Sequence, residues 1–180
     1  MTKAPRVFRA TLIRIIYMTN ADTKTSVATF AAGCFWSVEE TFRQVKGVVD
    51  VVVGYTGGTT LHPTYEQVCT GTTGHAEAVR VSYNPLVVSY QELLWVFFEH
   101  HTPTTKNRQG PDIGHQYRSA IFYHTDSERQ KAEKIITELT NKKRFSGRMV
   151  TELVPAEVFW RAEEYHQHYL QKHSLAVCPA

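Results

Sequence analysis

The order in which strand and helix patterns follow one another limits the fold of this chain more than any other feature. Apolar or alternating runs predict strands at 27–32, 48–54, 75–83 and 119–123. Apolar residues at helical spacing follow the first strand, and Ser89 caps a second predicted helix that ends at residue 100. The order strand, helix, strand, strand, helix, strand is typical of split βαβ folds. We therefore predict an α+β two-layer sandwich with a mainly antiparallel, ferredoxin-like sheet and helices on one face.

Further elements are predicted after residue 125, together with two long loops. These elements are a helix from 126 or 127 to about 143, a strand at 149–154 and an amphipathic helix from about 158 to 172. The stretches 55–74 and 102–117 are polar, contain Gly and Pro, and are predicted to be loops, the first with one or two helical turns at 64–69. Because a loop as long as 102–117 is uncommon in a compact domain unless it is functional, we expect it to contribute to a site.

Length and composition limit the classes of protein to which the chain can belong. Its 180 residues with 42% hydrophobic residues fit one soluble globular domain. A run of about 18 apolar residues is missing, so no membrane-spanning segment is expected. The formal charge of +3 comes from the first 26 residues, which hold five Lys or Arg and one Asp. Since the rest of the chain is nearly neutral, we expect no nucleic-acid partner.

The chain has three cysteines, Cys34, Cys69 and Cys178, which are far apart in the sequence. Three cysteines in a chain of this length argue against a disulfide scaffold and favour a reducing compartment or a reactive pair. A Cys-x-x-Cys pair is absent, which makes a structural zinc site unlikely on sequence grounds. We therefore expect no bound metal and no cofactor.

Cys34 lies at the junction between the first predicted strand and the first predicted helix. The spacing of Ser37 and Glu40 is that of a capping box, which predicts that the helix begins at or near Ser37. Unpaired N–H groups at a helix start favour the thiolate and can lower a cysteine pKa from about 8.5 to roughly 3.5–7.5. Chemistry alone leaves two interpretations open, a nucleophile and a small buried hydrophobic residue.

Three stretches together resemble the motifs of the A-type peptide methionine sulfoxide reductases, over about residues 27–178. The first is Gly33-Cys34-Phe35-Trp36 followed by Glu39, the second is 73–79 around Glu77, and the third is 110–119 around Tyr117. The resemblance implies thioredoxin-dependent reduction of free and protein-bound methionine-(S)-sulfoxide, which repairs oxidised proteins. The implied partners are thioredoxin and oxidised proteins or peptides that contain methionine sulfoxide.

The resemblance also implies a role for each matching residue. Cys34 corresponds to the nucleophile, and Phe35 and Trp36 correspond to the pocket that packs the S-methyl group. Glu77 corresponds to the acid that protonates the sulfoxide oxygen, a role for which burial would keep its carboxyl protonated near neutral pH. The remaining matches are Tyr65 and Tyr117, whose hydroxyls would hold the sulfoxide oxygen, and Asp112, which would bind the substrate backbone and shape the site.

Cys178 matches the resolving cysteine that the resemblance implies. It would condense with the sulfenic acid of Cys34 to a disulfide, which thioredoxin then reduces. Its place near the end of the chain would supply the mobility that this step needs. Cys69 is interpreted as structural.

The division of the chain follows from these patterns. We expect a flexible basic leader over 1–26 and a single catalytic domain over 27–180, with a mobile tail from about residue 173. The leader is open to three interpretations: an organellar transit peptide, a disordered segment, or a start at Met18. We favour a cytoplasmic monomer, with organelle targeting through residues 1–26 as the alternative.

A function of another class stays open from the sequence. A thiol hydrolase or acyltransferase would pair Cys34 with a histidine such as His75, His115 or His166. No local hydrolase motif surrounds Cys34, so the reductase is preferred.

Overall fold

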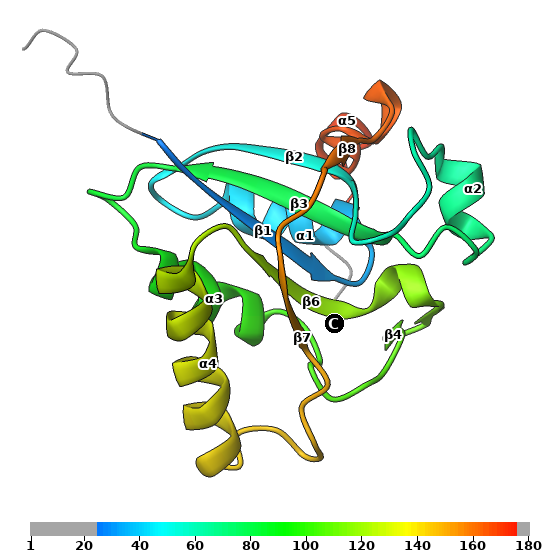
Figure 1. Cartoon of the computed structure of the whole chain (residues 1–180). Helices are drawn as coiled ribbons and strands as arrows, with labels where there is room; N and C mark the ends of the chain where they lie inside the picture. The colour runs from blue at the N-terminus through cyan, green and yellow to red at the C-terminus, as the bar shows by residue number, and fades with distance from the viewer. Residues whose placement is uncertain (1–24, 176–180) are drawn as a thin grey trace, which may run out of the picture.

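The computed structural model describes residues 25–175 of the chain (Figure 1). It is built around one sheet of six strands with helices packed against it. The strands of this sheet are β1 (Ser26–Ala32), β2 (Val48–Thr56), β3 (Ala76–Tyr83), β6 (Ser119–Tyr123), β7 (Glu152–Pro155) and β8 (Trp160–Arg161). The α-helices are α1 (Phe35–Arg43), α2 (Tyr65–Cys69), α3 (Tyr90–Glu99), α4 (Asp126–Asn141) and α5 (Tyr169–Lys172).

The sheet has the ferredoxin-like arrangement that the order of elements predicts. Its strand order is β7-β6-β1-β3-β2-β8, so β3 lies between the two strands that α1 connects, and β1 lies between the two that α3 connects. All neighbours pair antiparallel except β6 and β7, which are parallel. The predicted fold class is therefore confirmed, with one parallel pair added at the edge.

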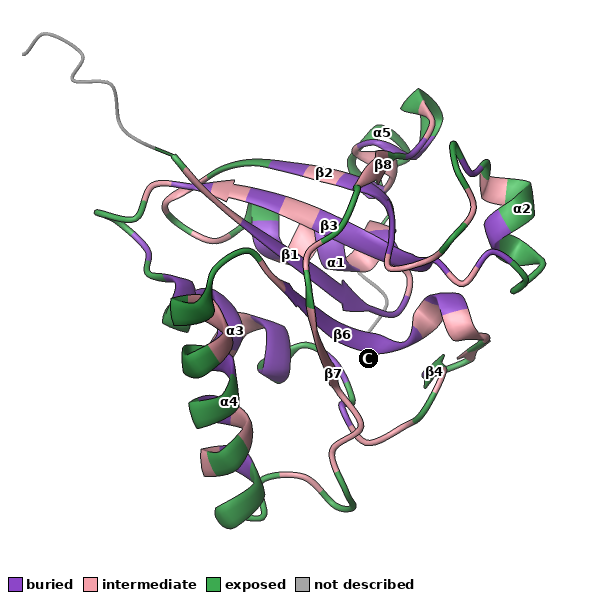
Figure 2. Cartoon of the chain, in the orientation of Figure 1, coloured by how far each residue is buried: buried purple, intermediate pink, exposed green. Residues whose placement is uncertain are grey.

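Large apolar side chains fill the space between the sheet and the helices α1, α3 and α4. Phe30 of β1 lies at the centre of this core, where its ring stacks on Phe42 at 5.1 Å and on Phe97 at 5.3 Å between centroids. Ile135 and Leu139 bring the inner side of α4 into the same cluster. The helices therefore pack through the apolar stripes that their sequences predict, and the buried residues follow those stripes in Figure 2.

The other face of the sheet carries smaller side chains. Ala31, Ala76, Ala78 and Ala120 form a second cluster with Phe122, which the segment 154–159 covers in part. Small residues allow that segment to lie close to the strands without a helix between them.

The C-terminal region differs from the prediction of one helix over about 158–172. Residues 160–161 pair with β2 as the short strand β8, and a 3-10 turn η2 (Glu164–His166) and the four-residue α5 follow. The Gln167 side chain accepts a hydrogen bond from the Val53 N–H and donates to the Val53 carbonyl. The amphipathic pattern of 158–172 predicted a helix wrongly, because the backbone groups at the open edge of β2 bond to this segment instead.

Several boundaries also differ from the prediction. The helix α1 begins at Phe35 with Cys34 as its N-cap, and the predicted capping box of Ser37 and Glu40 does not form. The strand β7 begins at Glu152 rather than at residue 149, and Thr125, not residue 126 or 127, caps α4. The loop 102–117 contains a small hairpin, β4 (Arg108–Gln109) and β5 (Asp112–Ile113), and the 3-10 turn η1 (His115–Tyr117).

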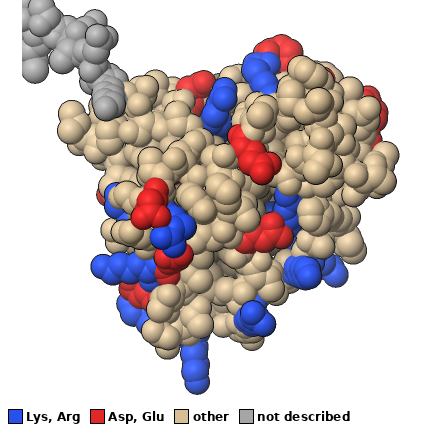
Figure 3. All heavy atoms as spheres, in the orientation of Figure 1, with Lys and Arg blue, Asp and Glu red and all other residues tan. Residues whose placement is uncertain are grey.

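Charged groups are mixed in sign on the face that Figure 3 shows, where Lys and Arg lie beside Asp and Glu. Within residues 25–175, no helix combines the length and the apolar character that crossing a bilayer requires.

We predict that Phe30→Ala lowers the free energy of unfolding by about 3–5 kcal/mol, because it leaves a cavity among three stacked rings. Urea denaturation measures the loss. Leu61→Ala is the matched control, since Leu61 is 76% exposed and its truncation should change stability by less than about 0.5 kcal/mol. Equal losses for the two variants would contradict the core described above.

Candidate active site

Cys34 occupies the turn between β1 and α1, where it is the N-cap residue of the helix. Gly33 precedes it with φ +93°, a conformation that favours glycine. A Cβ at Gly33 would lie 2.6 Å from the Cβ of Gln109, so the hairpin strand β4 can approach this turn only because residue 33 has no side chain. The turn therefore brings the loop 102–117 directly against Cys34.

Glu77 reaches the start of α1 from the neighbouring strand β3. Its Oε2 accepts a hydrogen bond of 3.0 Å from the Phe35 N–H, one of the N–H groups that a helix start leaves unpaired. The side chain is only 1% exposed, and burial raises the pKa of its carboxyl to about 8. The hydrogen bond from Phe35 lowers this pKa and the negative charge of Asp112 raises it, both by less than burial does. Glu77 is therefore protonated near neutral pH, as predicted from the sequence.

The pKa of Cys34 shifts in the direction opposite to the prediction. Burial, followed by the negative charge of Glu77, raises the pKa of the Cys34 thiol to about 12. The N–H groups of Trp36 and Ser37 act in the expected sense and lower it, but they do not compensate for the loss of water. The expectation of a thiolate at rest was wrong because the sequence could show the helix start but not its burial.

Tyr65, Tyr117 and Asp112 come from three separate elements and converge on the same site. Tyr65 begins α2, which Thr64 caps through a hydrogen bond from the Gln67 N–H, and Tyr117 ends the turn η1. Burial raises the pKa of both tyrosine hydroxyls, and the charge of nearby Glu77 raises them further. Both hydroxyls are therefore protonated and able to donate hydrogen bonds.

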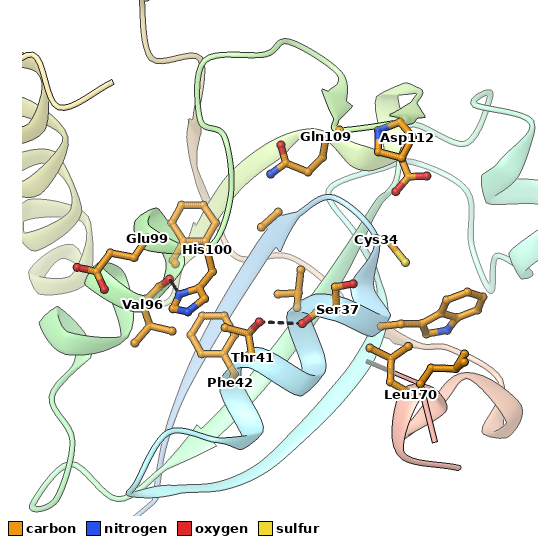
Figure 4. A pocket seen from close by; sticks show the side chains of 17 residues that line it. Cys34, Ser37, Thr41, Phe42, Val96, Glu99, His100, Gln109, Asp112 and Leu170 are labelled. Atoms are coloured by element: carbon orange, nitrogen blue, oxygen red, sulfur yellow. Dashed lines mark hydrogen bonds between the residues drawn. The ribbon is translucent and has the colours of Figure 1, made fainter. Parts of the chain in front are cut away.

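Asp112 lies on β5 and is half-buried. Its carboxylate raises the pKa of Cys34, Glu77 and Tyr117, which places it near all three. In Figure 4 the Asp112 side chain extends toward the side of the pocket where Cys34 lies.

The two aromatic residues after Cys34 have different environments. Phe35 is 1% exposed and belongs to the core, where its ring lies against Tyr55 and Tyr65. Trp36 is half-buried, lines the pocket beside Cys34, and stacks on Tyr169 with ring centroids 3.8 Å apart. Of the two rings, only that of Trp36 lines this pocket, and Phe35 belongs to the core.

Sequence reasoning missed the residues that hold these aromatic rings in place. The Trp36 indole N–H donates to Nδ1 of His166 over 3.1 Å, so the neutral His166 carries its proton on Nε2. Glu163 accepts hydrogen bonds from the Tyr55 hydroxyl and the Tyr65 N–H, both at 2.9 Å. Both residues belong to the segment that was predicted as a helix, and no local motif marks them. They could be found only once the pairing of β8 with β2 had placed that segment beside α1.

Glu39, the residue that completes the first motif, ties α1 to the C-terminal segment. Its buried side chain accepts a hydrogen bond of 2.9 Å from the His168 N–H. This contact fixes the segment that carries His166.

A cavity of about 600 Å³ opens beside Cys34 (Figure 4). Its walls come from one side of α1, the end of α3, the hairpin β4–β5 and α5. Residues from all four elements line it, including Cys34, Trp36, Val96, Asp112 and Leu170.

The alternative of a cysteine hydrolase receives no support from the geometry. Each of the three candidate histidines hydrogen bonds to other residues. His75 bonds to Gly58 and Thr60, His115 bonds to Arg118, and His166 bonds to Trp36. Over residues 25–175, none of these rings hydrogen bonds to Cys34. Cys178 lies outside the described residues, and the exposed Cys69 follows Tyr65 on α2.

A half-buried thiol lies beside a neutral carboxylic acid and two tyrosine hydroxyls, an arrangement that suits a cysteine-dependent enzyme. Residues 26–180 match the family described as peptide methionine sulfoxide reductase. The chain belongs to this family, an oxidoreductase family whose reaction is the reduction of methionine sulfoxide.

Known proteins are similar over most of the chain. The peptide methionine sulfoxide reductase MsrA of Acidobacterium capsulatum is 56% identical over 151 residues, which are 84% of this chain and 97% of that protein. The reduced form of Mxr1 from Saccharomyces cerevisiae is 39% identical with a TM-score of 0.81, and the match covers 88% of this chain and 91% of that one. Mxr1 in complex with Trx2 is 29% identical with a TM-score of 0.59, and the match covers 92% of this chain and 94% of that one. The relatives named MsrA confirm the A-type resemblance.

We predict that Cys34 reacts slowly with iodoacetamide at pH 7 and ever faster up to pH 10, because its pKa is raised to about 12. Above pH 8, where Glu77 is ionised, Glu77→Gln should label faster than the unchanged protein, since it removes the negative charge beside the thiol. Mass spectrometry of the peptides separates Cys34 from the exposed Cys69, which serves as the internal control. A plateau of Cys34 labelling near pH 6–7 would show a thiolate at rest instead.

Proposed function

We propose that Cys34 attacks the sulfur of methionine-(S)-sulfoxide, free or within a protein, while Glu77 protonates the sulfoxide oxygen. The observation that carries this proposal is the hydrogen bond from the Phe35 N–H to Glu77, because it fixes a neutral acid beside the thiol. A general acid must be protonated at the working pH and within reach of the atom that receives its proton. Glu77 meets the first condition through burial, and its position near the Cys34 thiol supports the second.

The reaction transfers the sulfoxide oxygen to the cysteine. The thiol and the sulfoxide give a sulfenic acid on Cys34 and methionine, so two electrons leave the cysteine sulfur and the S–O bond of the substrate breaks. The Cys34 proton replaces the one that Glu77 gives to the oxygen. A neutral thiol and a neutral acid therefore suffice at the start.

The remaining site residues bind and orient the sulfoxide. Tyr65 and Tyr117 donate hydrogen bonds from their hydroxyls to the oxygen and keep their protons, and Asp112 accepts a hydrogen bond from the substrate backbone. Trp36 packs against the methyl group from a position fixed by His166 and Tyr169, with Phe35 supporting it.

Recycling requires a second thiol and an external reductant. Cys178 condenses with the sulfenic acid to a disulfide and releases water, and thioredoxin reduces the disulfide. The support for thioredoxin is the similarity to Mxr1, whose structure with Trx2 was given above.

We also propose a setting for the reaction. The catalytic domain is placed at 27–180, after a basic leader over 1–26, and the small number of widely spaced cysteines favours a reducing compartment, the cytoplasm, with organelle targeting through residues 1–26 as the alternative.

Cys34→Ser should abolish the reduction of N-acetyl-methionine-(S)-sulfoxide, because the nucleophile is removed. In the presence of thioredoxin, its reductase and NADPH, Cys178→Ser should form one equivalent of methionine and then stop. Methionine released over time measures both, and Cys69→Ser is the control that should turn over like the unchanged protein. Full activity in Cys34→Ser would overturn the mechanism, and sustained turnover in Cys178→Ser would overturn the recycling route.

The pH profile of the first turnover reports on Glu77. Because the acid acts when protonated, the rate should fall as the pH rises through about 8. Glu77→Gln should lower the rate by roughly 10²–10⁴-fold and remove this fall. Glu157→Gln, at an exposed site, should keep both the rate and the profile. A first turnover in Glu77→Gln as fast as in the unchanged protein would take Glu77 out of the mechanism.

A further inference from the structure

The cavity beside Cys34 continues as an apolar groove along one side of α1. Ser37, Val38 and Thr41 line it after Cys34 at intervals that place them on a single helix face. From Cys34 to Thr41 this face is about 10 Å long, at 1.5 Å per residue. Val96 of α3 stands on the opposite wall (Figure 4). A methionine sulfoxide held at Cys34 would leave the rest of this groove uncovered.

The end of α5 directs the chain into the same groove. Ser174 has φ +52°, and the Leu175 N–H donates to the Leu170 carbonyl over 3.0 Å. This is the hydrogen bond of a Schellman motif, in which the residue after the turn packs on the last turn of the helix. Leu175 and Leu170 accordingly both line the groove. Leu175 is still 55% exposed, so it offers apolar surface to whatever follows or binds there.

The sequence that follows has the length and the chemistry to fill the groove. After Leu175 it reads Ala176-Val177-Cys178, three residues without charge. An extended chain advances about 3.3 Å per residue, so Cys178 can lie about 10 Å from Leu175. That reach is comparable to the length of the α1 face from Cys34 to Thr41, and Leu175 and Cys34 both line the same groove.

We propose that residues 176–178 dock in this groove before the disulfide forms, with the Val177 side chain packed between α1 and α3 and Cys178 delivered to Cys34. The inference deepens the proposed recycling step and rests on it. In that step the Cys178 sulfur attacks the sulfenic sulfur of Cys34, the S–O bond breaks, and the thiol proton leaves with the hydroxyl as water. Docking raises the effective concentration of the Cys178 thiol at the Cys34 sulfenic acid.

A neutral substitution at Val177 tests the docking without changing the charge beside Cys178. Val177→Asn should slow formation of the Cys34–Cys178 disulfide about tenfold after one turnover, because an amide loses the apolar contact. Val177→Leu is the matched control and should stay within about twofold. The release of the first methionine should be unchanged in both, since the groove acts after it. Quenched-flow samples with thiol counting give the two rates separately.

The reduced protein gives a second measurement that needs no disulfide. The methyl NMR signals of Val96 and Leu170 should shift on Val177→Asn and stay in place on Val158→Asn, which makes the same change at an exposed valine. Unmoved signals, or disulfide formation at the normal rate in Val177→Asn, would overturn the docking. A slower first turnover in Val177→Asn would assign the groove to the substrate and overturn it as well. If the unchanged protein forms no Cys34–Cys178 disulfide while the methyl signals shift, the recycling route fails and the docked tail stands.

Discussion

The hydrogen bond between the Phe35 N–H and Glu77 is the contact on which the site depends. A helix start normally takes a cap from its own sequence, but Cys34, the N-cap residue of α1, provides no side-chain cap. A carboxyl from the neighbouring strand fills this role and is buried by doing so. This hydrogen bond therefore caps the start of α1 and holds the Glu77 carboxyl beside the Cys34 thiol.

Burial then determines the charge state of that pair. Both the acid and the thiol have raised pKa values, because water is excluded, because the negative charge of Glu77 opposes that of Cys34, and because the charge of Asp112 opposes both. Two adjacent groups in such a site behave as one coupled system that resists holding two negative charges. Cys34 and Glu77 are thus a neutral pair at rest, and in the proposed reaction the sulfoxide oxygen is the acceptor that allows a proton to move.

The C-terminal segment completes the site from far along the chain. Gln167 fastens it to the edge of β2, Glu39 holds the His168 N–H, and His166 accepts the hydrogen bond of Trp36. Gly54 makes the pairing of β8 with β2 possible, because a Cβ there would collide with the Trp160 carbonyl oxygen. The site residues of this segment are therefore positioned by the short strand β8 and the four-residue α5, not by the long helix that periodicity predicted. The end of α5 lies at the cavity that Cys34 also lines.

The sequence by itself determined the order of the elements and the split βαβ fold, because local periodicity carries that information. Three short motifs led to the proposal of Cys34, Glu77, Tyr117 and Asp112 as site residues, and the family resemblance alone added Tyr65. The tertiary structure decided which of these groups are buried, and so it reversed the expected shift of the Cys34 pKa. It also decided that residues 158–172 pair with β2 instead of forming one helix. Contacts across 42 residues, from Phe35 to Glu77, and across 130 residues, from Trp36 to His166, leave no local pattern. Such contacts exist only when the sheet has brought distant segments together, which is why only the folded chain shows them.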